Sequence, residues 1–177
     1  DRSPSRGLGD VYKRQTIIVE DGSIVANANS YVTTAEFTQY CADRNITISG
    51  TYGDESQLLI LAMDYFEQQP FRGIKFIETQ PLQYPRSDLW IDGYLTDSDQ
   101  IPQLVKDAQI TIAISIMAGN DPLSTVDRAV KREKVDVLEV EYMDNASIST
   151  VIRSIGNAMR KLVTSSTGGN NIRTIRG

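Results

Sequence analysis

Residues 101–117 read IPQLVKDAQITIAISIM. In the first half, apolar residues fall at helical spacing and polar residues take the opposite side. The apolar set is Ile101, Leu104, Val105 and Ala108, and the polar set is Gln103, Lys106, Asp107 and Gln109. The second half is apolar apart from small hydroxyls. A helix that is apolar on most sides must be enclosed, so this stretch predicts a central helix on which the other elements pack.

The alternation in residues 110–116, ITIAISI, is also compatible with a strand, because isoleucine is β-branched. Pro102 in a tolerated first-turn position and Gly119 after the end favour one continuous helix. Thr111 and Ser115 can return their hydroxyls to the preceding helical turn, so neither needs a functional role. The stretch is too short, and too polar at its start, to span a bilayer.

Two more helix starts can be recognised nearer the N-terminus. Thr33 and Glu36 form a capping box, with Val32 and Phe37 as the accompanying hydrophobic staple, for a helix that runs to about residue 44. Asp54 and Gln57 begin a second helix in the same way, and Pro70 ends it. Residues 16–20, TIIVE, predict a short strand, and a turn at residues 21–22 follows.

A β element and a last helix are predicted after the central helix. Residues 130–143, VKREKVDVLEVEYM, have two out-of-phase alternations, which imply a bulge or turn near residues 136–138. Residues 148–162 show the clearest amphipathic helix of the chain. The predicted fold class is therefore α+β and mainly α-helical: a compact bundle of about four helices with a small β-hairpin element.

The segment between the second and the central helix, residues 71–90, combines two prolines with several large apolar groups. We expect an ordered loop with short extended pieces, clamped by Tyr84 and Trp90. Arg72 and Arg86 are flanked by aromatic residues and prolines, and they are the best candidates for a polar contact that fixes this loop. Asp92-Gly93 predicts a turn.

The first fifteen residues, DRSPSRGLGDVYKRQ, have neither an apolar period nor a helix cap. They resemble a translated sequencing-adapter read-through, and we interpret residues 1–15 as a non-native scar. The sequence then predicts a single domain over residues 16–163. Residues 164–177, rich in Ser, Thr, Gly and Asn, are expected to be a flexible basic tail.

Charge is distributed unevenly along the chain. Residues 16–152 carry nine basic and 21 acidic residues, a net charge of −12. Residues 153–177 carry five basic residues and no acidic one. The body should therefore repel nucleic acid at long range, and only the C-terminal end could attract it.

The residues of the commonest catalytic sites are missing from the sequence. The chain has no histidine, and its single cysteine, Cys41, is typical of a small buried hydrophobic residue. It also lacks a Gly-rich phosphate loop and the GxSxG and HExxH motifs. We therefore expect no enzyme activity, no cofactor and no metal. A single cysteine allows no disulfide within the chain, which suggests a reducing compartment.

Several stretches resemble a family of tailed-bacteriophage proteins. Residues 16–45, TIIVEDGSIVANANSYVTTAEFTQYCADRN, resemble the opening that the family shares. QPLQYPRSDLWIDG at residues 80–93 and IPQLVKDAQITIAI at residues 101–114 resemble its PLxWPR-like and IPxxVKxAxxxLA-like stretches, with Tyr84 where a Trp is usual. VKREKVDVLEVEYMD at residues 130–144 resembles its EKVGxxxVxY segment, with Asp136 in place of the usual Gly. The ending IRG resembles its basic C-terminal tail.

The resemblance implies a function. The family is often labelled a DnaT-like single-stranded-DNA-binding domain, and it is also similar to small helical head–tail connector (adaptor) proteins. The similarity to connectors implies a homo-oligomeric ring in the virion neck, at the head–tail junction, which would be assembled in the host cytoplasm. The partners implied are the portal protein and downstream head-closure or tail proteins, without a membrane.

Two readings follow from the sequence, and we place the connector first. An acidic body suits a ring through which DNA passes without specific binding, because phosphate affinity comes from basic groups. The alternative is a DnaT-like single-stranded-DNA-binding protein, which would need a basic groove with exposed aromatic residues. The candidate contacts, with portal, neighbour or nucleic acid, are Arg160, Lys161, Ile172, Arg173, Ile175 and Arg176.

Overall fold

The computed structural model describes residues 16–49, 54–120, 122–123, 133–135, 138–140 and 146–164. Within these ranges the chain forms four α-helices and short antiparallel hairpins, so the predicted α+β, mainly helical fold is confirmed. The helices are α1 (Thr34–Asp43), α2 (Glu55–Phe66), α3 (Gln103–Met117) and α4 (Ala146–Met159). The predicted scar at residues 1–15 and the tail beyond Thr164 lie outside the described residues.

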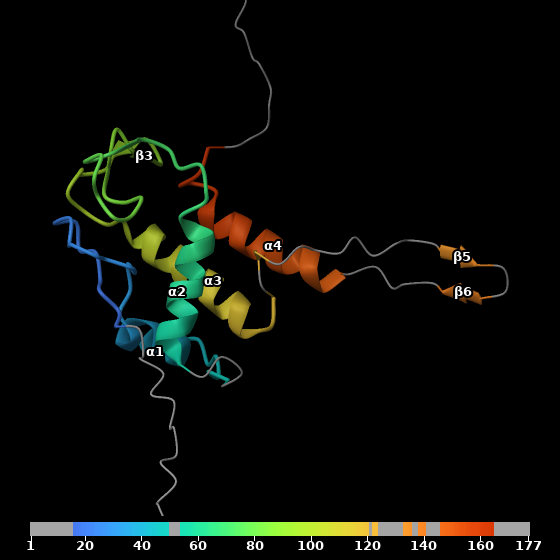
Figure 1. Cartoon of the computed structure of the whole chain (residues 1–177). Coiled ribbons are helices and arrows are strands. Elements are labelled where there is room, and N and C mark those ends of the chain that lie inside the picture. The colour runs from blue at the N-terminus through green and yellow to red at the C-terminus, as the bar shows by residue number, and fades with distance from the viewer. Residues whose placement is uncertain are drawn as a thin grey trace, which may run out of the picture.

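Helix α3 is the central element, as its sequence predicts. It packs between α2 and α4, and α1 lies against α2 (Figure 1). Val105, Ala108, Ile112 and Ala113 of α3 are fully buried. The helix begins one residue after Pro102, which is its N-cap, and it ends before Gly119.

The capping box predicted for α1 is present, and of the pair predicted for α2 the structure shows the Asp54 cap. The Glu36 N–H donates to Thr33 Oγ1 at 3.1 Å, and the Thr33 N–H donates to Glu36 Oε2 at 2.8 Å. The staple residues Val32 and Phe37 are both fully buried. Asp54 caps α2 by accepting from the Ser56 N–H. These local signals act within one turn of chain, which is why the sequence alone predicts them.

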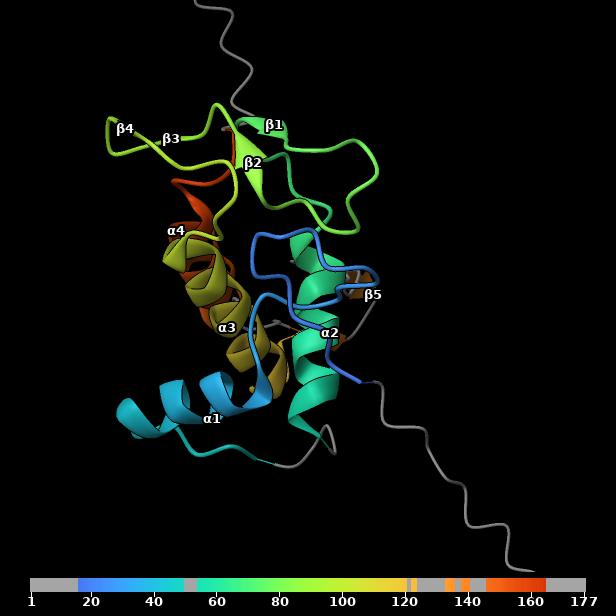
Figure 2. The same ribbon diagram turned by 90° about the vertical axis from the view of Figure 1, so that its left-hand side faces the viewer.

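Three hairpins are seen in the described part of the chain. They pair β1 (Ile74–Lys75) with β2 (Arg86–Ser87), β3 (Trp90–Ile91) with β4 (Tyr94–Leu95), and β5 (Glu133–Val135) with β6 (Leu138–Val140). Val135 pairs with Leu138, so the chain reverses direction where the sequence predicts a bulge or turn; residues 136–137 themselves lie outside the described residues. The β5–β6 hairpin lies apart from the helices (Figure 1), whereas β1–β4 gather at one end of the helical bundle (Figure 2).

The polar side assigned to the central helix is wrong at one residue. Gln109 is fully buried, because its amide forms hydrogen bonds with two other segments of the chain. It accepts from the Tyr31 N–H at 2.9 Å, and it donates to Ser30 Oγ at 2.8 Å and to the Leu59 carbonyl at 3.2 Å. A buried amide is tolerated when its donors and acceptor find partners. Helical periodicity contains no information about such partners.

Two hydroxyls of α3 behave differently. Thr111 Oγ1 donates to the Asp107 carbonyl at 2.7 Å, as expected for a hydroxyl that returns to the preceding turn. Ser115 Oγ is buried and has no hydrogen-bond partner within the described residues, so that part of the expectation is wrong.

The strand predicted at residues 16–20 is reduced to a single bridge between Val19 and Ser30. The reason lies in Glu20, whose buried carboxylate accepts from the N–H groups of Gly22, Ile24 and Val25 at 2.8–2.9 Å. These bonds fold the chain back around one side chain instead of extending it along a partner strand.

Candidate nucleic-acid interface

Exposed apolar side chains concentrate at one end of the molecule. We call this the hairpin end: residues 70–97 together with Arg160–Thr164 after helix α4. Trp90 is 58% exposed and Tyr94 is 79% exposed. The other large apolar residues exposed there are Ile74, Phe76, Ile77 and Leu95. Aromatic rings that are exposed on short hairpins contribute little to core packing, and such rings can stack against bases.

The turn between β3 and β4 fixes how these rings are presented. Asp92 and Gly93 both have positive φ, 53° and 86°, which is the backbone of a two-residue type I′ turn. The register pairs Trp90 with Leu95 and Ile91 with Tyr94. Since facing residues share one side of a hairpin, Trp90 and Leu95 lie on one face. Ile91, on the other face, packs against the core and so orients Trp90 outward.

Arg86 holds the loops of the hairpin end together from inside. Its guanidinium donates to the Arg72 carbonyl at 2.7 Å, to the Gly73 carbonyl at 2.8 Å and to Gln83 Oε1 at 2.9 Å. It is 8% exposed, and its ring neighbours are Phe71 and Tyr84. The predicted loop-fixing role of Arg86 is therefore confirmed. Burial lowers the pKa of this guanidinium, and nearby Tyr84 opposes that shift.

A second network supports the same loops from the side of α2. The Tyr31 hydroxyl donates to Glu67 Oε1 at 3.1 Å and accepts from the Tyr84 N–H at 2.9 Å. The Gln83 N–H also donates to Glu67 Oε1, at 3.2 Å. Burial raises the pKa of Glu67, although the hydrogen bonds from Gln83 and Tyr31 act against it. Tyr84 is fully buried, so it clamps the loop as predicted, whereas Trp90 does not.

The end of α4 joins the hairpin end through backbone contacts. The Arg72 N–H donates to the Leu162 carbonyl and Arg72 Nε donates to the Val163 carbonyl, both at 2.9 Å. The Thr164 N–H donates to the Pro70 carbonyl at 2.7 Å. Arg72 thus confirms the second loop-fixing prediction. The contacts bring the basic end of the sequence next to the exposed aromatic residues, although the two are about 70 residues apart in the chain.

Of the predicted contact residues, two fall within the described chain, and both lie here. Arg160 is exposed, and Lys161 is half-buried with its Nζ 2.6 Å from Asp92 Oδ2. Ile172, Arg173, Ile175 and Arg176 lie outside the described residues. Sequence reasoning missed Trp90 and Tyr94, because it assigned the first to a clamp and gave the second no role. The Asp-Gly pair between them was the available signal, since a tight turn projects its flanking residues into solvent.

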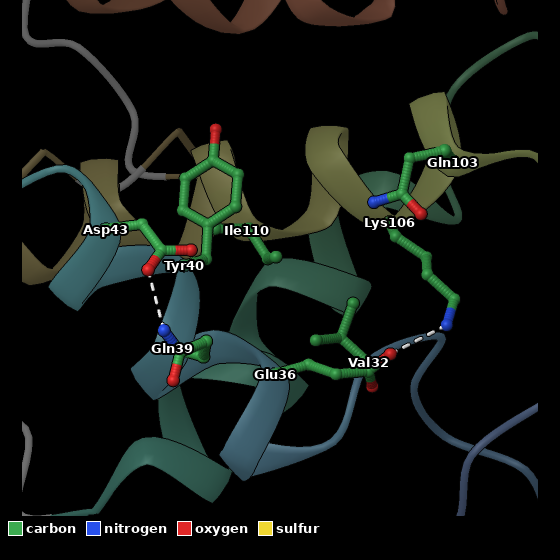
Figure 3. Close-up of a pocket in the computed structure, with 8 residues that line it drawn as sticks. All are labelled: Val32, Glu36, Gln39, Tyr40, Asp43, Gln103, Lys106 and Ile110. Carbon is green, nitrogen blue, oxygen red and sulfur yellow. Dashed lines mark hydrogen bonds and ion pairs between the residues drawn. The ribbon is translucent and has the colours of Figure 1, made fainter.

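A concave site lies elsewhere, between α1 and α3 (Figure 3). It has a volume of about 230 Å³ and is lined by Val32, Glu36, Gln39, Tyr40, Asp43, Gln103, Lys106 and Ile110. Its charged groups are already engaged: Lys106 Nζ contacts Glu36 Oε1 at 2.8 Å, and Gln39 donates to Asp43 at 2.6 Å. Two carboxylates against one lysine make it a poor site for a phosphate.

Other kinds of site were sought in the described ranges. No group of three or more His, Cys, Asp or Glu residues there is placed to hold a metal ion. None of the described helices has the length and apolar character needed to cross a membrane. Cys41 is buried and unpaired, as the sequence predicts.

A comparison with protein families finds one whose model matches residues 15–177, nearly the whole chain. Its description is "Putative DnaT-like ssDNA binding protein". Neither the curated proteins nor the solved structures contain a match to the chain.

Proposed function

We propose, on the premise that this chain belongs to the family of DnaT-like ssDNA-binding proteins, that it binds single-stranded DNA through the hairpin end. One observation carries the proposal. Lys161, which follows the exposed Arg160 just after α4, contacts Asp92 in the turn of the hairpin that holds Trp90 and Tyr94 in solvent. Single-strand binders combine these two features, since cations attract the phosphates and aromatic faces stack on the bases.

The acidic body limits how such a protein would bind. Phosphate attraction falls off within about 10 Å at 0.1 M salt, so a local basic group can act although residues 16–152 carry a net charge of −12. Acidic residues also stand at the hairpin end, among them Glu78, Asp88 and Asp92. We therefore expect weak binding, in which stacking makes a large share of the affinity and salt suppresses the share that comes from phosphate contacts.

Trp90 provides a direct test, because it is the single tryptophan of the chain. Titration with unlabelled oligo(dT) should quench the tryptophan fluorescence, and duplex DNA of equal charge should quench it much less. Tyr94→Ala should weaken binding, since loss of one base–aromatic stack costs about 1–3 kcal/mol. Tyr65→Ala is the matched control, because Tyr65 is a half-buried tyrosine of α2 that packs against the core. Equal affinity in the wild type and in Tyr94→Ala would contradict the proposed interface.

The head–tail connector remains a second proposal. The comparison matches the single-stranded-DNA-binding alternative rather than this role. The observation in its favour is the charge of residues 16–152, which suits a channel along which DNA slides. Rings seen by negative-stain microscopy of the protein mixed with a cognate portal, in the absence of DNA, would support it. A protein that stays monomeric and does not bind the portal would exclude the connector role.

A further inference from the structure

We infer that Lys161 binds a backbone phosphate of single-stranded DNA, and that the Asp92 carboxylate takes the place of this phosphate in the free protein. When DNA binds, the phosphate displaces the carboxylate from Lys161. The inference rests on the proposed function: Lys161 is the residue that contacts DNA, and Asp92 competes with the DNA for it. Its basis is the 2.6 Å contact between Lys161 Nζ and Asp92 Oδ2, which joins the end of α4 to the β3–β4 turn.

The position of Lys161 favours a ligand from solvent. Its side chain is 43% exposed and that of Asp92 is 60% exposed, so a phosphate can reach the lysine without any core rearrangement. A carboxylate and a phosphate present the same chemistry to an ammonium group: anionic oxygens that accept charge-assisted hydrogen bonds. An ion pair at this exposure is weak, so displacing the carboxylate costs little.

The end of a helix would ordinarily disfavour an anion, because its carbonyl groups point there. The last carbonyl of α4 is engaged, since Met159 O accepts from the Leu162 and Val163 N–H groups. In the segment after the helix, Leu162 O accepts from the Arg72 N–H and Val163 O from Arg72 Nε. The Arg72 guanidinium therefore adds positive charge to the segment that follows α4.

The β3–β4 hairpin places this lysine near two exposed rings. Asp92 is in the two-residue turn, and Trp90 and Tyr94 are each two positions from it along the chain, on opposite faces of the hairpin. A phosphate that replaces the Asp92 carboxylate would then belong to a nucleotide whose base lies near one of these rings. Phosphate contact and base stacking would occur together in one short segment of strand.

Substitution of Asp92 by Asn tests the inference without disturbing the turn. Asn-Gly is a preferred pair for a type I′ turn, so Asp92→Asn should fold normally. With Lys161 freed, affinity for oligo(dT) at low salt should rise about two- to fivefold, the range of one exposed ion pair. The slope of log K against log salt should stay that of the wild type, because Lys161 contacts one phosphate in both complexes, whereas Lys161→Gln should make it shallower by roughly 0.7.

A double-mutant cycle separates this contact from a general change of charge. In a Lys161→Gln background, Asp92→Asn should give no gain in affinity, because no lysine is left to release. Asp97→Asn is the matched control, because it removes one exposed negative charge from an aspartate that accepts from Gln100. An equal gain with and without Lys161, or from Asp97→Asn, would overturn the inference while leaving the proposed function in place. Absence of binding by every variant would overturn both.

Discussion

The Gln109 amide joins three segments of the chain in the core. It is bonded to the Tyr31 N–H, to Ser30 Oγ and to the Leu59 carbonyl. Gln109→Leu keeps the approximate volume but leaves the Tyr31 N–H without its acceptor. A buried group left unsatisfied costs about 1–3 kcal/mol, so the free energy of unfolding should fall by that amount in urea denaturation.

The same helix supplies a control. Gln103 is exposed and donates to Asp107 at 3.0 Å, on the surface of α3. Gln103→Leu should change the free energy of unfolding by no more than about 0.5 kcal/mol, as is usual for surface substitutions. Equal losses for the two variants would mean that the Gln109 network contributes no stability of its own.

Glu67 makes the stability depend on pH. Burial raises its pKa above 4.5, so between 4.5 and its folded pKa the native state binds more protons than the unfolded state. Stability conferred by this group is therefore present below the unfolded pKa and lost as the pH rises through the folded pKa. Glu67→Gln keeps an oxygen that accepts from Tyr31 and Gln83 and carries no charge at any pH.

The measurement is the difference in unfolding free energy between Glu67→Gln and the wild type at a series of pH values. The free energy of unfolding of the variant, relative to that of the wild type, should increase as the pH rises from about 4.5 towards 7, because the variant lacks a partly buried carboxylate that must ionise. A difference that stays constant with pH would show that Glu67 titrates as it does in the unfolded chain.

At the scale of elements, two glycines have opposite roles. Gly73 precedes β1 with a φ of +73°, and a Cβ there would lie 2.6 Å from the Ser87 carbonyl oxygen of β2. Gly156 lies inside α4 with open space around it. Gly156→Ala should stabilise the protein by about 0.5–1 kcal/mol, since glycine is unfavourable in a helix interior.

Gly73→Ala should instead destabilise the protein and disturb the β1–β2 pairing. The strained backbone costs on the order of 1–3 kcal/mol, and the clash with a backbone oxygen has no flexible group to absorb it. Thermal unfolding of both variants gives the comparison, and a rise in melting temperature for Gly73→Ala would disprove the tight approach of β1 to β2.

Elements whose signals are local could be predicted from the sequence. The capping box of Thr33 and Glu36, the Asp92-Gly93 turn and the period of α3 each act within a few residues. The β1–β2 pair could not be predicted, because it spans ten residues of loop and depends on the Arg86 guanidinium, which reaches the carbonyls of Arg72 and Gly73. Gln109 was misplaced for the same reason, since its partners are about 50 and 79 positions away.

The whole molecule shows why the candidate site was only partly foreseen. Arg160 and Lys161 stood out by charge, and the sequence placed them on the correct segment. Their proximity to Trp90 and Tyr94 arises from tertiary contacts, such as the bridge between Phe71 and Val163. Trp90 was predicted to clamp its loop, as suits a large aromatic residue that is usually highly buried, and the Asp92-Gly93 turn beside it was the one local signal against that.

The remaining predicted contacts, Arg173 and Arg176, follow the residues that the structure describes, and they can be tested by truncation. A chain that ends at Thr164 keeps Arg160, Lys161 and the Thr164 contact with Pro70. Its unfolding free energy should stay within about 0.5 kcal/mol of the full chain, because the composition of the removed residues predicts a flexible tail. Its binding to oligo(dT) should weaken, because two arginines are lost.

The salt dependence determines what the tail contributes. If both arginines contact phosphates, the slope of log K against log salt should become shallower by roughly 1.4, at about 0.7 for each phosphate on a single strand. Arg173→Gln with Arg176→Gln in the full chain should reproduce this change, which separates charge from chain length. An unchanged slope would limit phosphate contact to the hairpin end. A truncated protein that binds DNA normally but no longer docks to a cognate portal would instead assign the tail to the connector role.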